Sequence, residues 1–106
     1  FQGVGCIVVS LSLLELDSGF RNLSFELDIW VEIWQDWLPS SEQNWLHIDP
    51  CEAAIDEPLL YQDWGKNQTC ILAFTRTSVD DVTHFYTTKL EEAKASRQRS
   101  SKRKQE

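Results

Sequence analysis

The sequence has 106 residues, which is enough for one domain or part of one, and its 42% hydrophobic and 25% charged content is typical of a globular chain. No apolar run reaches the roughly 20 residues that a membrane-spanning helix needs, so we expect no membrane span. Three widely spaced cysteines give neither a disulfide framework nor a paired zinc pattern, which favours a reducing compartment. Methionine is absent, so we expect a segment that starts within a longer protein.

The net charge of −7 is distributed unevenly along the chain. Residues 1–88 hold three basic and fourteen acidic residues, whereas residues 89–106 hold seven basic and three acidic ones. The acidic part would repel phosphates, so we expect no nucleic-acid binding there. We therefore divide the chain into a partial domain at 1–88 and a basic tail at 89–106, with a helix over 90–95 and disorder from Ser96 onward. A solvated end is the favoured interpretation of this tail, and contact with an anionic partner is the alternative.

The local signals conflict over residues 6–17. Ile7-Val8-Val9 favours a strand, whereas the leucines at positions 11, 13 and 14 favour a helix. Asp17-Ser18-Gly19 is a typical helix end, so we predict a buried helix over 6–17. Residues 20–23 are predicted to be extended.

Two stretches alternate with a period of two, which is typical of half-buried strands. They are residues 27–34 and residues 45–49. In each strand the aliphatic residues share one face, and the polar and aromatic residues share the other. If the two strands are neighbours, one surface combines carboxylates, a histidine and tryptophans, and that surface is the candidate site. Its members are Asp28, Trp30, Glu32 and Trp34 from the first strand, and Trp45, His47 and Asp49 from the second.

The remaining elements follow from turn signals and apolar runs. Residues 35–44 are a polar connection, Pro50 ends the second strand, and residues 52–61 form a turn-rich crossover with one helical turn. Thr69 to Thr75 is continuously apolar and predicts a central strand, and residues 79–83 predict a short final strand. The fold class is therefore α+β, with a helix followed by an antiparallel sheet.

Several short motifs, in this order and spacing, resemble the cytosolic peptide:N-glycanase family. The resemblance is specific from about Asp28 to Tyr86, and the motifs are Asp49-Pro50-Cys51-Glu52, Ile55-Asp56-Glu57-Pro58-Leu59-Leu60-Tyr61, Trp64-Gly65-Lys66, Ile71-Leu72-Ala73-Phe74 and Asp81-Val82-Thr83. It implies part of a transglutaminase-like core, which is related to the papain arrangement. It also implies an amidase that cleaves the bond between an N-linked glycan and its asparagine on misfolded glycoproteins.

The family's reaction needs a cysteine nucleophile, a histidine base and an aspartate that orients the histidine. The resemblance places the aspartate at Asp49, but the histidine position holds Asp28 and the cysteine position holds Val4. Two members of the triad are therefore missing. We interpret the remaining cysteines and histidines as structural residues; they are Cys6, Cys51, Cys70, His47 and His84.

The family's triad also implies a register in which Asp28 opposes Asp49, Trp30 opposes His47 and Glu32 opposes Trp45. Two opposed carboxylates would raise one carboxyl pKa or hold a cation. The alternative is that Asp28 simply reaches solvent.

The resemblance implies that Trp30, Glu32 and Trp45 contact the glycan-bearing substrate, because flat aromatic faces suit sugar C–H groups and a carboxylate suits hydroxyls. The alternative is that the tryptophans only cover the core. No cofactor or metal ligand set is expected within this chain, since the family's zinc-binding cysteines lie upstream of the matching part.

Together these features predict a non-catalytic glycanase-like binding module. Its expected partners are misfolded N-glycoproteins or their glycans, together with ubiquitin- or proteasome-shuttle proteins, and its expected location is the cytoplasm, with the nucleus as an alternative. Two other hypotheses stay open: an active amidase whose N-terminal segment is misread or whose triad is completed unusually, and a scaffold without glycan contact.

Overall fold

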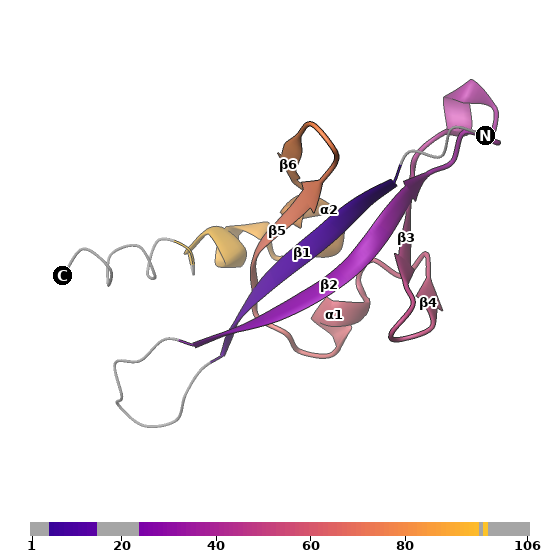
Figure 1. The fold of residues 1–106 in the computed structure, drawn as a ribbon. Helices are drawn as coiled ribbons and strands as arrows, with labels where there is room; N and C mark the ends of the chain where they lie inside the picture. Colours follow the sequence, from indigo (N-terminus) through magenta and orange to yellow (C-terminus); the bar gives the residue numbers. More distant parts are fainter. Residues whose placement is uncertain (1–4, 15–23, 96, 98–106) are drawn as a thin grey trace.

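In the computed structural model, which describes residues 5–14, 24–95 and 97, one antiparallel sheet carries short helices on one of its faces (Figure 1). The strand order is β4-β3-β2-β1-β5-β6. The strands are β1 (Gly5–Leu14), β2 (Ser24–Trp34), β3 (Trp45–Asp49), β4 (Ala54–Ile55), β5 (Gln68–Phe74) and β6 (Val79–Asp81), and the helices are η1 (Ser40–Glu42), α1 (Leu60–Asp63) and α2 (Thr83–Tyr86). Among the described helices, none is long and apolar enough to cross a bilayer.

The first described element is a strand, so the predicted helix over 6–17 is wrong for residues 6–14. The long strand β1 pairs with β2 on one side and with β5 on the other. Ile7-Val8-Val9 suits this position, because β-branched residues pack well on a pleated surface. The predicted helix end at Asp17-Ser18-Gly19, and the extended segment at 20–23, lie outside the described residues.

The pairing of β2 with β3 confirms that the two alternating stretches are neighbours, but the predicted register is wrong. Glu32 pairs with His47 and Trp34 pairs with Trp45. Each partner is therefore shifted by two residues from the expected position, and Asp28 does not oppose Asp49. A shift of two residues keeps every side chain on its expected face, so only the cross-strand partners change.

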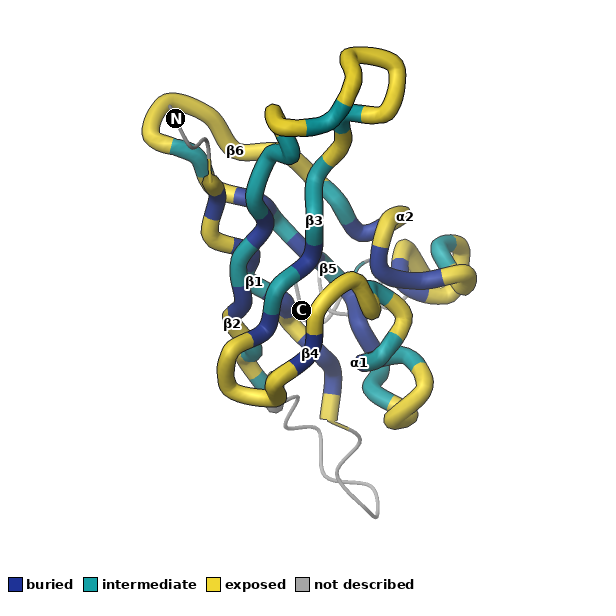
Figure 2. Tube along the Cα trace, turned by 90° about the vertical axis from the view of Figure 1, so that its right-hand side faces the viewer, coloured by how far each residue is buried: buried dark blue, intermediate teal, exposed yellow. Residues whose placement is uncertain are grey.

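The burial of the two faces of the sheet is the reverse of that in a simple amphipathic sheet, whose aliphatic face is covered. The polar and aromatic face is the covered one: Glu32, His47 and Asp49 are buried. The helices α1 and α2 lie on this side (Figure 2). The opposite face carries aliphatic residues that are open to solvent, including Ile7 and Leu27.

The core forms around Trp30, of which only 1% is exposed. Its indole stacks on Tyr61 of α1, with ring centroids 4.0 Å apart and planes at 10°. Tyr86 of α2 meets the same indole edge-on at 4.9 Å. Aromatic pairs in these geometries add about 0.5–1.5 kcal/mol each beyond their buried area, so Trp30 fixes both helices on the sheet.

The segment after α2 continues along the same side. Residues 90–95 are helical, as predicted, and Ala93 is buried. The guanidinium of Arg97 donates to the Thr69 carbonyl on β5 and to the Thr83 hydroxyl, the latter at 2.9 Å. The basic segment is thus attached to the sheet as far as Arg97, and the prediction of disorder from Ser96 onward otherwise falls outside the described residues.

Candidate functional site

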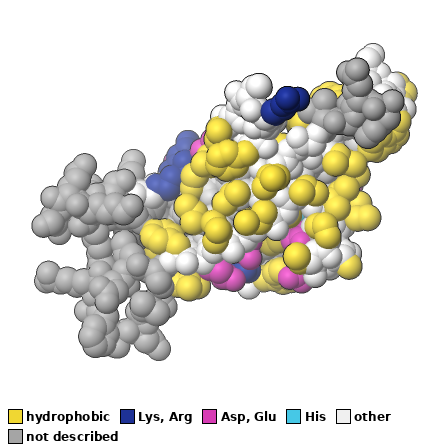
Figure 3. All heavy atoms as spheres, viewed as in Figure 1, with side chains coloured by type: hydrophobic (Ala, Val, Ile, Leu, Met, Phe, Trp, Pro, Cys, Tyr) yellow, Lys and Arg dark blue, Asp and Glu magenta, His cyan; other side chains and the backbone are white. Residues whose placement is uncertain are grey.

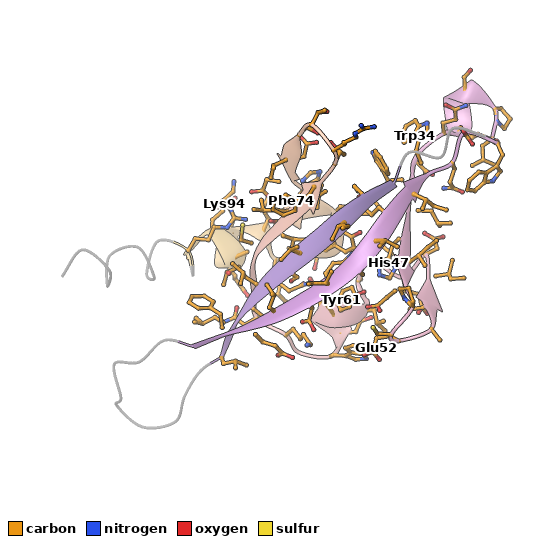
Figure 4. All side chains as sticks on the ribbon, viewed as in Figure 1. Trp34, His47, Glu52, Tyr61, Phe74 and Lys94 are labelled. Carbon is orange, nitrogen blue, oxygen red and sulfur yellow. The ribbon has the colours of Figure 1, made fainter. Side chains whose placement is uncertain are left out.

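A chain of hydrogen bonds joins β3 to α1 at the covered face of the sheet. The Tyr61 hydroxyl lies 2.6 Å from Asp49 Oδ2 and 2.7 Å from His47 Nε2. Figure 4 shows His47 and Tyr61 side by side beneath β2. His47 and Asp49 are two residues apart on β3 and therefore point the same way, so a single tyrosine bridges them.

The neighbouring contacts determine which atom donates in each of these hydrogen bonds. The backbone N–H of Glu57 donates to His47 Nδ1 at 3.2 Å, so the imidazole proton lies on Nε2 and is donated to Tyr61. Tyr61 in turn donates to Asp49, whose Oδ1 also accepts the N–H of Glu52 at 3.2 Å. Burial lowers the pKa of His47, because desolvation disfavours the imidazolium. Burial and the bond to Asp49 raise the pKa of Tyr61, so both groups stay neutral at physiological pH.

Asp28 makes an ion pair with Lys66. Lys66 Nζ lies 2.8 Å from Asp28 Oδ2 and 2.7 Å from Glu26 Oε1. Burial alone would lower the pKa of Lys66, but the bonds to the two carboxylates outweigh it and raise the pKa. The lysine is therefore a fixed cation and cannot act as a base near neutral pH.

The end of α1 places Lys66 next to these carboxylates. Gly65 has φ of 79°, and its N–H donates to the Gln62 carbonyl, while the Lys66 N–H donates to the Tyr61 carbonyl. This pair of bonds is the Schellman helix end, which needs a left-handed residue at the glycine position. The Trp64-Gly65-Lys66 motif is thus a turn that sets where the lysine and the tryptophan lie.

Glu32 is buried and receives two bonds from neighbouring elements. Cys6 Sγ of β1 donates to Oε1 at 3.4 Å, and the Tyr86 hydroxyl of α2 donates to Oε2. Burial, which has the largest effect, and the negative charge of Glu32 together raise the pKa of the Cys6 thiol to about 12. Cys6 is therefore kept as an unreactive thiol and not as a thiolate.

A pocket of about 310 Å³ opens beside these groups. Its volume is at the lower end of the range for small-molecule sites. Carboxylates, an ammonium group and aromatic rings meet in its wall, and 49% of the Trp64 surface is exposed. The lining residues are Leu27, Asp28, Ile29, Asp49, Cys51, Glu52, Tyr61, Trp64 and Lys66.

The structure brings together only some of the predicted site residues. Asp28 and Asp49 line one pocket although they do not oppose each other, whereas Trp30 and Glu32 are fully covered by the helices. Trp45 is partly exposed and packs edge-on against Trp34 at 5.3 Å. Trp30 therefore fits the core interpretation, and a substrate contact by Trp45 stays a prediction.

Sequence reasoning gave no role to Tyr61, Trp64 or Lys66, which supply much of the site. The signal for Tyr61 was indirect: a buried aspartate such as Asp49 needs a donor, and no donor was assigned to it. Among the described residues, no cluster of three acidic, histidine or cysteine side chains forms a cation site.

Comparison with known proteins gives consistent matches along most of the chain. Residues 22–106 match the family described as "Rad4 transglutaminase-like domain". Three similar proteins carry the name "Peptide-N(4)-(N-acetyl-beta-glucosaminyl)asparagine amidase". The one from Rattus norvegicus is 42% identical over 82 residues, covering 73% of this chain and 13% of the relative.

The other two matches extend this similarity to distant organisms. The protein from Drosophila melanogaster is 34% identical over 83 residues, covering 77% of this chain and 12% of the relative. The protein from Debaryomyces hansenii is 38% identical over 90 residues, covering 83% of this chain and 23% of the relative. The chain thus spans less than a quarter of the length of these relatives.

Proposed function

Since the chain belongs to the Rad4 transglutaminase-like domain family, as a peptide:N-glycanase-like segment, we propose that it binds N-glycoproteins without cleaving their glycans. The observation that carries this proposal is the ion pair between Asp28 and Lys66, at the position where the family's histidine base is expected. A carboxylate bound to a lysine cannot take a proton from a thiol, and it cannot use Asp49 as an orienting partner.

The contacts of Asp49 and the state of the described cysteines support the same proposal, whereas Val4, at the expected nucleophile position, lies outside the described residues. Asp49 accepts its side-chain bond from Tyr61, and the nearby His47 contacts Tyr61 and not Asp49, so among the described residues this carboxylate orients no imidazole directly. Cys6 is 5% exposed, and its raised pKa makes it a poor nucleophile. Cys51 lines the pocket, but no imidazole is among the described lining residues.

The pocket keeps features that suit a sugar. The exposed indole of Trp64 offers a flat face for sugar C–H groups, and the carboxylates of Asp28 and Glu52 with the ammonium of Lys66 offer bonds to hydroxyl and acetamide groups. We therefore place the glycan contact at Trp64 and the Asp28–Lys66 pair, with Trp45 as an outlying aromatic contact.

The cellular setting belongs to the same proposal. The three free cysteines, one of them exposed, suit a reducing compartment such as the cytosol or nucleus. There the segment would take part in handling misfolded N-glycoproteins, together with ubiquitin- or proteasome-shuttle proteins. The family's zinc site would lie outside this chain.

A binding titration tests the proposed contact. An asparagine-linked chitobiose peptide is titrated into the protein and followed by NMR shift changes or calorimetry. Trp64→Ala should weaken binding about 5-fold or more, because losing an aromatic platform costs about 1–3 kcal/mol. Trp37→Ala is the matched control, because Trp37 is also about half exposed, at 55%, but lies outside the pocket lining.

Two results would refute the binding role. One is an absence of saturable binding to the glycopeptide, and the other is equal binding by the Trp64→Ala and wild-type proteins. Binding without any release of glycan, together with sensitivity to Trp64→Ala alone, is the result that the proposal requires.

A further inference from the structure

The sheet buries several polar side chains on the face that the helices cover. Figure 3 shows hydrophobic side chains gathered over β1 and β2 on the opposite face. Ser12 of β1 and Gln68 of β5 are register partners, so their side chains project to the same side of the sheet. Both are buried, and only 5% of Gln68 is exposed. Because a buried polar group needs a hydrogen-bond partner, the contacts of these two residues show what the covered face can bind.

The side-chain amide of Gln68 has no hydrogen-bond partner among the described residues, at either its nitrogen or its oxygen. In that part of the chain it is the one side chain that leaves two buried polar atoms unpaired. The hydroxyl of Ser12 beside it is unpaired as well. Gln68 therefore offers an N–H donor and a carbonyl acceptor to a ligand or to water.

The Gln68 amide lies in the wall of a cavity of about 170 Å³, which we call the Gln68 cavity. It forms where α1 ends and β5 begins, and residues 87–93 complete its wall. At about 30 Å³ for each water molecule, this volume corresponds to about five waters. It is smaller than a drug-sized site, so the Gln68 cavity has room for a few waters or for one sugar residue.

Bonds between elements fix the wall around Gln68. The carbonyl oxygen of the Gln62 side chain accepts the Thr87 hydroxyl and the Thr88 N–H, both at 2.7 Å. The Thr87 hydroxyl in turn accepts the Lys89 N–H at 3.0 Å. These bonds join α1 to the segment after α2, so the shape of the cavity is set by groups that already have partners, whereas Gln68 keeps its bonding capacity.

The charges of the wall favour a neutral ligand. The Lys66 ammonium is paired with two carboxylates. Lys89 and Glu92 contribute opposite charges from exposed positions at the rim. Adjacent hydroxyls of a sugar suit Gln68, because one accepts the amide N–H while its neighbour donates to the amide oxygen. Sugar hydroxyls also bond as water does, so they can replace ordered water without losing hydrogen bonds.

The turn after α1 connects the Gln68 cavity to the glycan contact. Trp64 and Lys66 line the pocket of that contact, and Lys66 and Gly65 line the Gln68 cavity. Gly65 places no side chain between them, and a Cβ there would meet no atom within 4 Å. Four Cα steps of about 3.8 Å put Trp64 and Gln68 at most about 15 Å apart. A glycan of a few sugar residues can therefore reach both.

We propose that Gln68 forms a second sugar subsite, which binds a vicinal diol of an N-glycan whose first residues lie on Trp64. This inference rests on the proposed function, because the contact at Trp64 sets where the glycan begins. It adds a preference for N-glycans that extend beyond chitobiose. Gln68 binds the outer sugar through both ends of its amide, and the fixed wall limits this subsite to one residue.

Glycopeptides of two lengths test the subsite by calorimetry. One carries asparagine-linked chitobiose, and the other has the same peptide with the mannose-containing core pentasaccharide. The protein should bind the longer glycan about 5-fold or more tightly, because two neutral hydrogen bonds are added. Gln68→Met should remove this gain and leave the affinity for chitobiose unchanged. Gln43→Met is the matched control and should keep the gain, because Gln43 bonds the Leu38 carbonyl in the connection between β2 and β3.

Two further measurements separate binding from a structural role. Gln68→Met should not lower the urea midpoint, since the described residues give the amide no partner; a lower midpoint would identify Gln68 as a structural residue and overturn the proposal. The NMR signals of the Gln68 side-chain NH₂ group are identified by their absence from the Gln68→Met spectrum. They should shift with the longer glycan and not with chitobiose. Signals that shift with neither would mean that the cavity holds ordered water only, which would also overturn the subsite.

The outcomes distinguish this subsite from the contact at Trp64. Binding of chitobiose without any gain from the longer glycan would overturn the Gln68 subsite alone. A gain that persists in Gln68→Met would place the outer sugar elsewhere, with the same consequence. An absence of binding by both glycopeptides would refute the proposed function and the subsite together.

Discussion

Replacing Tyr61 by phenylalanine tests whether the hydrogen-bond chain stabilises the fold. The change keeps the ring that stacks on Trp30 at 4.0 Å but removes the hydroxyl that bridges His47 and Asp49. The bond to the carboxylate contributes about 1.5–3 kcal/mol and the bond from the imidazole about 0.5–1.5 kcal/mol. The expected loss in the free energy of unfolding is therefore about 2–4.5 kcal/mol.

Urea unfolding followed by tryptophan fluorescence measures this loss, because the dominant core indole, Trp30, stacks directly on the altered ring. For a domain of this size, the same loss lowers Tm by about 8–36 °C. The comparison is made at one protein concentration, since association contributes to apparent stability. A loss below about 0.5 kcal/mol with an unchanged m-value would show that Asp49 and His47 find other partners. It would then follow that the hydrogen-bond chain does not stabilise the fold.

Three further predictions follow from the charges and pKa shifts. Burial lowers the pKa of His47 below the 6.5 of an unfolded chain, so stability is complete above pH 6.5 and falls as the pH drops below it, by up to about 1.4 kcal/mol per unit. His47→Gln should flatten this slope in urea midpoints measured at several pH values, and an unchanged slope would contradict the assignment. With the pKa of Cys6 raised to about 12, alkylation at pH 8 followed by mass spectrometry should modify the exposed Cys51 about 1,000-fold faster than Cys6; equal rates would mean that Cys6 is accessible as a thiolate. Lys66→Met should destabilise the fold by about 1 kcal/mol, because the ion pairs are partly buried, while Lys94→Met, at an exposed pair, should leave the urea midpoint unchanged.

The alternating strands could be predicted from the sequence because their pattern is local. Every second residue of β2 and β3 lies on the face that alternation indicates, and the apolar run over Thr69 to Thr75 forms β5. The helix prediction was wrong over 6–14 because it considered the leucines of this segment without the strands that pair with it on either side. β1 pairs with β2 along its whole length and with β5 from Ile7 to Ser12, and this tertiary effect outweighs a weak local preference.

The register of β2 on β3 could not be read from the residues. A connection as long as residues 35–44 does not fix pairing in the way that a two-residue turn does. The predicted partners instead came from the family's triad positions, which the resemblance places at Asp28 and Asp49. The prediction placed the side chains on the correct faces but gave them the wrong cross-strand partners, because a two-residue slip preserves the alternation of a strand.

Local sequence patterns also could not predict which face of the sheet is buried. Alternation shows that two faces differ, but not which one the helices cover. Trp30, Glu32 and His47 are buried because tyrosines from α1 and α2 supply hydrogen bonds and stacking that a lone strand does not reveal. The ion pair of Asp28 with Lys66 joins residues 38 positions apart, so it likewise needed the fold.

The most direct test of the central claim is a glycan-release assay with the complete protein. A denatured high-mannose glycoprotein is incubated with it, and release is read as a gel shift and as free glycan by mass spectrometry, beside an active peptide:N-glycanase as the positive control. The ion pair of Asp28 with Lys66 and the bond from Tyr61 to Asp49 predict no release above the buffer control. Release that is abolished by Asp49→Ala would contradict this account and show that the protein is an active amidase.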